Sequence, residues 1–288
     1  MTHHSSKPIN KLKDSVADSA TEAAVILHYP QAGVAELILN RPAKRNAFDD
    51  LIIQQLLEKL AEAAANTQLR LLILRSNGKH FSAGADLSWM QRMAHNSHAD
   101  NLADAQQLAK LMQTLNSFRT PTLALVQGAA YGGAVGLAAC CDIVIASEDA
   151  RFCLSEVKIG LIPAVISPYV IRAIGERQAR RYFLSAEVIQ AEQAQSMGLV
   201  HERVSSPAEL ASAAQRFIQQ LSHNSPQAMV AAKALIFTVS QQPIDQSVIA
   251  ATAHSIADIR VSTEGQEGLN AFLNKRRPQW LLEENQDV

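Results

Sequence analysis

One carboxylate of the sequence stands inside an apolar stretch. Glu156 lies within residues 152–163, FCLSEVKIGLIP, a segment that ends in a glycine and a proline. Burial there would raise the pKa of this carboxyl towards the range in which it moves protons at neutral pH. A second interpretation is a salt bridge to Lys158, which lies two residues on and shares a face with Glu156 if the segment is extended. The residues therefore indicate either a proton-transferring glutamate or a structural ion pair.

Two turns of small residues could present backbone amides to a ligand. The first covers residues 79–87, KHFSAGADL, and the second covers residues 127–136, QGAAYGGAVG, which leads into a helix. Small side chains let a ligand approach backbone N–H groups, and a helix N-terminus adds the positive end of its dipole. One amide from each turn would make a two-donor oxyanion hole, in which one donor is typically worth ~2.7–4 kcal/mol. Taken singly, each turn is more simply an ordinary glycine turn.

Other glycine motifs fit this chain poorly. Gly132, Gly133 and Gly136 do not form G-x-G-x-x-G, and no lysine follows them as a P-loop requires. No G-x-S-x-G nucleophile elbow occurs in the sequence. The turns therefore do not indicate a dinucleotide fold, a P-loop or a serine hydrolase.

The three segments, in this order and spacing, resemble the signature of the enoyl-CoA hydratase/isomerase (crotonase) family. The similarity covers nearly the whole chain from about Ala24, and it includes residues 39–42, 46–47 and 267–278. It implies an α/β fold of the ClpP/crotonase type, a spiral of ββα units. It also implies a C-terminal helical part that mediates homotrimers, often paired into hexamers.

The resemblance also implies roles for particular residues. The amides of Ala85 and Gly133 would form the oxyanion hole, and Glu156 would be catalytic. Phe272 and Lys275 fall where a neighbouring subunit often adds contacts. The residues placed at the coenzyme A or substrate site are Lys44, Arg45, Ala83, Ala85, Asp86, Leu87, Gly132, Gly133, Lys158, Phe272 and Lys275.

The chain departs from the family at one position. Typical hydratases of the family hold the reacting water between two glutamates; Glu156 matches the second, but Gly136 stands at the first. A lone carboxylate suffices for double-bond isomerisation, so an isomerase stays open. Residues 130–142 and 152–168 nevertheless resemble a bacterial methylglutaconyl-CoA hydratase branch that also lacks the first glutamate. That branch implies branched glutaconyl-CoA esters of leucine or acyclic terpene breakdown as substrates.

Hydration of such an ester is the leading hypothesis. Glu156 would act as base on a water that adds at Cβ, and the protonated carboxyl would return the proton to Cα. Gly136 is expected to leave space in which the substrate's distal carboxylate helps to position the water, with Lys158 holding that carboxylate. A non-catalytic acyl-CoA-binding protein on the same fold is the hypothesis from another class.

Strands and helices alternate along most of the chain, which favours an α/β core. We expect a strand, turn and strand over residues 24–39 and a helix over residues 49–65 capped by Asp49. The further expected elements are strands at 69–75, 122–126, 142–146 and 199–204, helices at 88–93, 101–117 and up to 141, and mainly helices beyond 168. The expected division is a tail over 1–23, a core over 24–205 and a helical trimerisation region over 206–288.

Composition limits the remaining function classes. The chain has 288 residues, 48% of them hydrophobic, and its 26 basic and 27 acidic residues give a net charge of −1, which offers no footprint for nucleic acid. No apolar run of about 18 residues lacks charge, so we expect no membrane span and a cytoplasmic location. The three cysteines indicate small buried hydrophobes in a reducing compartment. His80 and Asp86 are expected to pack or cap locally, and no metal or separate cofactor is expected, because coenzyme A enters with the substrate.

Overall fold

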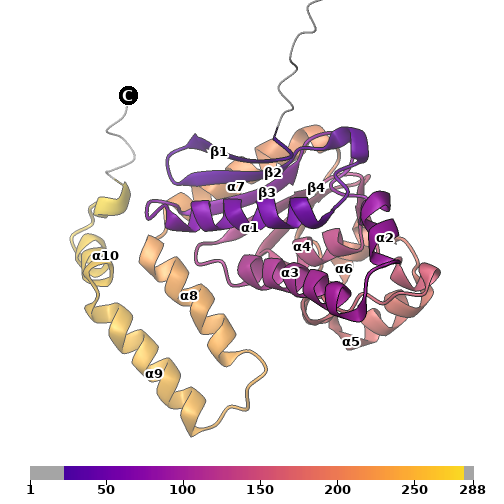
Figure 1. Ribbon diagram of the computed structural model, residues 1–288. Coiled ribbons are helices and arrows are strands. Elements are labelled where there is room, and N and C mark those ends of the chain that lie inside the picture. The colour runs from indigo at the N-terminus through magenta and orange to yellow at the C-terminus, as the bar shows by residue number, and fades with distance from the viewer. Residues whose placement is uncertain (1–22, 282–288) are drawn as a thin grey trace, which may run out of the picture.

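A six-stranded sheet forms the centre of the protein in this computed structural model, which describes residues 23–281 (Figure 1). Its strands, in spatial order, are β1 (Val25–Gln31), β2 (Val34–Leu39), β3 (Leu71–Ser76), β4 (Thr122–Val126), β6 (Ile143–Ser147) and β9 (Glu202–Val204). β1 and β2 are an antiparallel hairpin, and every later neighbour is parallel. β3 and β4 are almost wholly buried, as expected of parallel strands covered on both faces.

A second, three-stranded sheet lies beyond the carboxyl ends of these strands. It consists of β5 (Ala129–Tyr131), β7 (Arg151–Cys153) and β8 (Ile189–Gln190). β5 pairs in parallel with β7, so Ala130 lies opposite Phe152, and a further bridge joins Ala130 to Ser82. Three segments that are distant in sequence are therefore held side by side by backbone hydrogen bonds.

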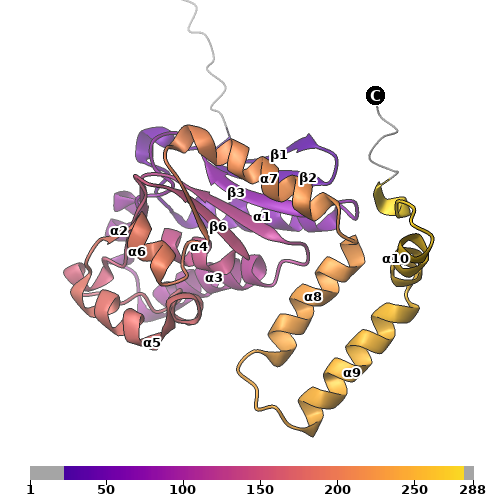
Figure 2. The same cartoon turned by 180° about the vertical axis from the view of Figure 1, so that it is seen from behind.

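Helices cover both faces of the central sheet (Figures 1 and 2). On one face the helices are α1 (Asp50–Ala65), α3 (His98–Asn116) and α4 (Gly133–Cys140), and on the other it is α7 (Leu210–Ser222). The remaining helices of the body are α2 (Leu87–Met93), α5 (Ser167–Ser185) and α6 (Ala191–Ser196), with the short 3₁₀ helices η1 (Pro42–Lys44), η2 (Glu156–Ile159) and η3 (Pro207–Glu209). Asp49 caps α1 as expected, because its side chain accepts from Ile52 N.

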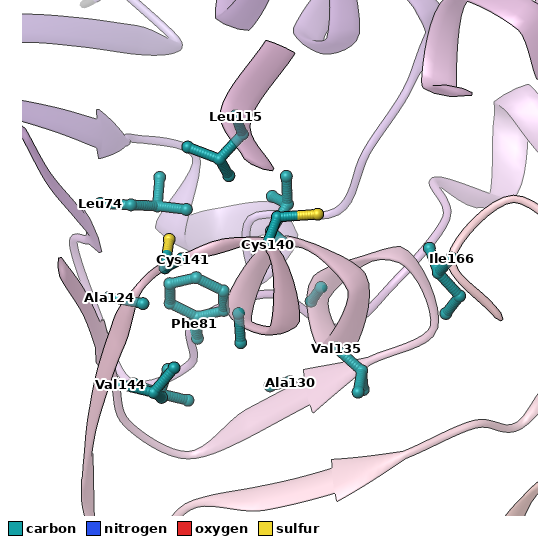
Figure 3. Close-up of a cluster of buried hydrophobic side chains, with 14 of the residues drawn as sticks. Leu74, Phe81, Leu115, Ala124, Ala130, Val135, Cys140, Cys141, Val144 and Ile166 are labelled. Carbon is teal, nitrogen blue, oxygen red and sulfur yellow. The ribbon is translucent and has the colours of Figure 1, made fainter. Parts of the chain in front are cut away.

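The cysteines belong to the larger hydrophobic cluster or to its edge. Figure 3 shows Cys140 and Cys141 among buried side chains that include Phe81 and Leu74. Burial raises the pKa of the Cys141 thiol to about 12. Cys153 is also buried and free. The expectation of small buried hydrophobes is confirmed.

The last helices leave the body of the molecule. α8 (Pro226–Val239), α9 (Gln246–Val261) and α10 (Thr263–Leu273) extend away from the sheet and are followed by η4 (Gln279–Leu281) (Figures 1 and 2). Lys233 of α8 ties them back, since its Nζ lies 2.6 Å from Asp142 Oδ2. α7 instead packs on the sheet, so the chain leaves the body after α7 rather than at residue 206. The predicted tail lies, but for residue 23, outside the described residues.

Within residues 23–281, the structure contains no helix with the length and apolar character needed to cross a bilayer.

Candidate active site

The first turn lies between two backbone segments that fix its course. On one side, Phe48 N donates to Gly84 O at 2.8 Å and Asp86 N donates to Phe48 O at 2.6 Å. On the other side, Ser82 pairs with Ala130. In a parallel bridge the N–H of the residue between these two bonds points away from the partner strand. The N–H of Ala85 is that group, and it has no acceptor among the described residues.

The second turn places another free amide next to the first. Gly132 takes a positive φ of 55° and donates its N–H to Cys153 O at 2.9 Å. Gly133 follows as the first residue of α4, where an N–H has no partner inside the helix. Phe48 joins the turns, because a Cβ built on Gly133 would lie 3.6 Å from its ring. Two unpaired N–H groups on adjoining turns are what a two-donor oxyanion hole requires.

Glu156 brings a carboxylate to the same place. Its Oε1 lies 3.2 Å from the position that a Cβ on Gly132 would occupy. Its Oε2 is buried and has no hydrogen-bond partner within the described residues. Burial raises the pKa of the Glu156 carboxyl, and a hydrogen bond to its own backbone N–H opposes this only in part. The glutamate is therefore placed and tuned to exchange protons beside the two amides.

The alternative interpretation of Glu156 as half of a salt bridge is wrong. The segment is not extended but forms η2, with three residues per turn. Residues two apart then point in different directions, and Lys158 is exposed. No ion pair joins it to Glu156 in the part of the chain that the structure describes.

The expected space at Gly136 is also absent. A Cβ built there would lie 2.2 Å from Ile166 Cγ2, 2.7 Å from Ile166 Cβ and 3.2 Å from Met112 Sδ. The isoleucine fills the volume next to the glycine. The prediction that Gly136 leaves room for a substrate carboxylate is therefore wrong, because a residue thirty positions on folds back onto α4.

Asp86 is a helix cap, as expected. Its side chain accepts from Ser88 N at 2.9 Å, at the start of α2. Lys44 Nζ lies 3.3 Å from Asp86 Oδ2. Burial alone would raise the pKa of Asp86, but the hydrogen bonds from Ser88 and Lys44 outweigh it and hold that pKa below its ordinary value.

The remaining predicted contact residues fall into two groups. Lys44, Arg45 and Leu87 are exposed beside the first turn, and Ala83 is half-buried within it. Phe272 and Lys275 lie at the end of α10, on the opposite side of the molecule from α2 (Figures 1 and 2). The structure thus brings the first group to the site and leaves the second group away from the site of its own chain. Binding of coenzyme A by either group stays a prediction.

Two polar side chains that support the first turn, Arg41 and Asn46, had no predicted role. Arg41 Nη1 lies 2.6 Å from Asp49 Oδ2, and its Nη2 lies 3.6 Å from Asp86 Oδ2. Asn46 is 3% exposed, and its Nδ2 donates to His80 O at 2.8 Å. The polar residues that follow β2 in the sequence could have indicated these supporting contacts.

His80 links the two turns through its ring. Its Nδ1 accepts from Ala129 N at 3.1 Å, which requires an unprotonated nitrogen. Partial burial, with the positive charge of Lys79, lowers the pKa of His80 and favours that form. The expected local role of His80 is confirmed.

A cavity of about 320 Å³ lies between α1, α2 and α3. Its lining residues are Asp50, Ile53, Gln54, Trp89, Asp104 and Gln107. The cavity contains none of the groups around Glu156. No group of three metal-binding side chains is placed to hold an ion in residues 23–281.

Known proteins are similar to this chain over most of its length. A family model described as enoyl-CoA hydratase/isomerase matches residues 30–283. The 2,3-dehydroadipyl-CoA hydratase of Escherichia coli is 36% identical over 249 residues, which are 86% of this chain and 95% of that protein. The structure of an enoyl-CoA hydratase from Shewanella pealeana is 50% identical, covers 90% of this chain and 96% of its own, and superposes with a TM-score of 0.87. Pseudomonas aeruginosa AtuE is 33% identical, with coverages of 90% and 100% and a TM-score of 0.85.

Proposed function

The chain belongs to the enoyl-CoA hydratase/isomerase family, and from that premise we propose that it hydrates a branched 2-enoyl-CoA ester with a distal carboxylate. The simplest such ester is 3-methylglutaconyl-CoA. The fold is the crotonase fold, and the family acts on acyl-CoA thioesters. What we propose beyond family membership is the identity of the acyl group and hydration, rather than isomerisation, as the reaction.

The observation that carries the proposal is the unpaired, buried Oε2 of Glu156 beside two unpaired amides. The Glu156 carboxylate takes a proton from water as the water oxygen bonds to Cβ. The Cα=Cβ electrons move to form an enolate, whose oxygen accepts hydrogen bonds from the N–H groups of Ala85 and Gly133. The Glu156 carboxylic acid then gives its proton to Cα, which restores the thioester and the carboxylate.

A distal carboxylate on the substrate gives the water a second hydrogen-bond acceptor. In a 3-methylglutaconyl ester this carboxylate is borne by the CH₂ attached to Cβ, so it reaches a water that approaches Cβ without needing a pocket at Gly136. The E. coli relative is named for the thioester of another dicarboxylic acid, which supports substrates of this kind. Lys158 is an exposed cation on η2, next to Glu156, and we propose that it pairs with this carboxylate.

Coenzyme A enters as part of the substrate, with no separate cofactor in the proposal. Lys44 and Arg45 are exposed cations beside the turn that carries Ala85, and they suit the phosphates of its nucleotide end. Phe272 and Lys275 suit the same ligand bound to a neighbouring copy, within a homotrimer or a hexamer made of two trimers.

The test compares three thioesters with the purified full chain. 3-Methylglutaconyl-CoA, crotonyl-CoA and a 3-enoyl-CoA are incubated with wild type, Glu156→Gln and the control Glu176→Gln, whose side chain is 78% exposed on α5. We expect the branched ester to gain the mass of one water, and Glu156→Gln to lower kcat by ~10²–10⁴-fold while the control does not. Double-bond migration without added water would instead identify an isomerase. Binding without turnover would identify a non-catalytic acyl-CoA-binding protein.

One further variant tests Lys158. Lys158→Met should raise the KM of the branched ester but not that of crotonyl-CoA, which lacks the second carboxylate. An unchanged KM for the branched ester would remove Lys158 from the proposal.

A further inference from the structure

We propose that Ile166 is a specificity-determining residue: it occupies the place of a second water-holding side chain, so the enzyme prefers esters that bring their own acceptor. The proposal rests on the proposed hydration. It adds the residue that decides between carboxylated and plain 2-enoyl esters.

Gly132 and Gly136 each leave space at the start of α4 that a side chain from elsewhere fills. Gly132 is the N-cap, where its φ of 55° is not helical, and Gly136 lies in the first turn of the helix. Glu156 covers the first, with Oε1 3.2 Å from its Cβ position, and Ile166 covers the second at 2.2 Å.

The side chains that approach Gly132, Gly133 and Gly136 from elsewhere are those of Glu156, Phe48, Ile166 and Met112. Among them only Glu156 carries an oxygen acceptor, and the aliphatic side chain of Ile166 supplies none. The reacting water therefore has one protein carboxylate, and its second acceptor must come from the substrate.

Ile166 is fixed in this place. It is 2% exposed, and Met112, whose Sδ lies 3.2 Å from the same Cβ position on Gly136, is 0% exposed. Its carbonyl accepts from Tyr169 N and Val170 N, each at 3.1 Å, which anchors it at the start of α5. Figure 3 shows its side chain at the border of the buried cluster, beside the helix that carries Val135. Gly136 and Ile166 thus form an interlocked pair in which neither residue can grow or shift alone.

The interlock is tested first, by melting temperature, which needs no substrate. Gly136→Ala should melt below wild type, because its Cβ meets both Cγ2 and Cβ of Ile166. Adding Ile166→Gly removes both atoms, so the double variant should melt no lower than Ile166→Gly alone. A Gly136→Ala protein as stable as wild type would overturn the interlock.

Specificity is tested with Gly136→Glu/Ile166→Gly, which exchanges the isoleucine for a second carboxylate. The readout is kcat/KM for crotonyl-CoA divided by kcat/KM for 3-methylglutaconyl-CoA. We expect the ratio to rise roughly tenfold over Ile166→Gly alone, the worth of about one hydrogen bond to the water. Adding Glu156→Gln should abolish the gain. A folded double variant with an unchanged ratio would overturn the proposal.

Smaller side chains at position 166 test the specificity proposal if the double variant does not fold. Ile166→Val and Ile166→Ala only remove methyl groups, and the vacated volume lets a second water act as the missing acceptor. The ratio should then rise stepwise from isoleucine to valine to alanine, and a ratio that stays flat across this series would overturn the proposal. Failure of the proposed function is recognised separately, as absent hydration of every ester by wild type.

Discussion

Glu156 is a costly residue for the fold and a useful one for the reaction. A buried carboxylate oxygen without a partner lowers stability, because the charged form has lost water and gained little in return. The same loss of solvation raises the pKa of the carboxyl, which brings its proton affinity nearer to that needed at neutral pH. Burial of this carboxyl therefore lowers the stability of the folded protein and favours proton transfer.

The raised pKa of Glu156 predicts how the stability of the folded protein depends on pH. Because the pKa is raised in the folded protein, the folded state keeps the proton over a range of pH in which the unfolded chain has lost it. Stability therefore falls as pH rises through that range. Glu156→Gln does not ionise, so it should melt above wild type at neutral pH. The gap should close near pH 4, around the ordinary glutamate pKa of ~4.3.

Melting curves from pH 4 to pH 8 provide the measurement, with Glu176→Gln as the control for removing an exposed carboxylate. A gap that widened towards low pH would show that the folded protein stabilises the charged form of Glu156, contrary to its buried and unpaired state.

At the scale of elements, backbone bridges rather than side chains bring the site together. Phe48 pairs with Ala85, Ser82 pairs with Ala130, and β5 pairs with β7 just before η2. The bridge to Phe48 uses the C=O of Gly84 and the N–H of Asp86 and leaves the N–H of Ala85 unpaired. The N–H of Gly133 is unpaired because this residue begins α4.

The sequence predicts the local part of this arrangement well. The helix after Asp49 and the strand Thr122–Val126 follow from periodicity and capping, and both are confirmed. The turn of η2 and the packing of Ile166 on Gly136 were missed. Both depend on tertiary contact, which no periodic pattern encodes, and a glycine looks the same in sequence whether its neighbouring space is empty or filled.

Arg41 connects the elements that hold the first turn. Its guanidinium lies between Asp49, the cap of α1, and Asp86, the cap of α2, and these residues flank the bridge from Phe48 to Ala85. Arg41→Gln should lower kcat roughly ten- to hundredfold with little change in KM, because a displaced amide weakens binding of the enolate oxygen. Arg41→Lys should recover only part of the lost kcat, since lysine lacks the planar guanidinium that contacts both aspartates.

The control is Arg75→Gln, which removes an arginine paired to Glu36 at 2.9 Å in the central sheet. The near-ultraviolet absorbance of the enolate of bound acetoacetyl-CoA reports the oxyanion hole directly and should weaken in Arg41→Gln only. A lower melting temperature with unchanged kcat and enolate signal would make Arg41 merely structural.

At the scale of the whole molecule, the C-terminal helices bury few of their side chains within a single chain. α9 contains no buried residue, and the single buried side chain of α8 is Lys233, both helices lying wholly in the described part of the chain. Large apolar side chains are exposed over this region: Ile236, Phe237, Ile249, Ile256, Val261, Leu269, Phe272 and Leu273. α8, α9 and α10 contact one another, and large apolar side chains exposed on neighbouring helices mark an interaction site. We propose that other copies of this chain cover it.

Two matched variants test this assembly by sedimentation. Val261 at the end of α9 is 78% exposed, and Leu184 at the end of α5 is 77% exposed, so aspartate at either position meets similar solvent in the single chain. We expect wild type to sediment at three or six times the mass of one chain. Val261→Asp should yield smaller species and a higher KM for every acyl-CoA, because Phe272 and Lys275 then lose the neighbouring site. Leu184→Asp should keep the wild-type mass. A monomeric wild type would contradict the assembly, and the exposed face of α9 would then need a different partner. Equal dissociation by both variants would show that the subunit contacts are not specific to α9.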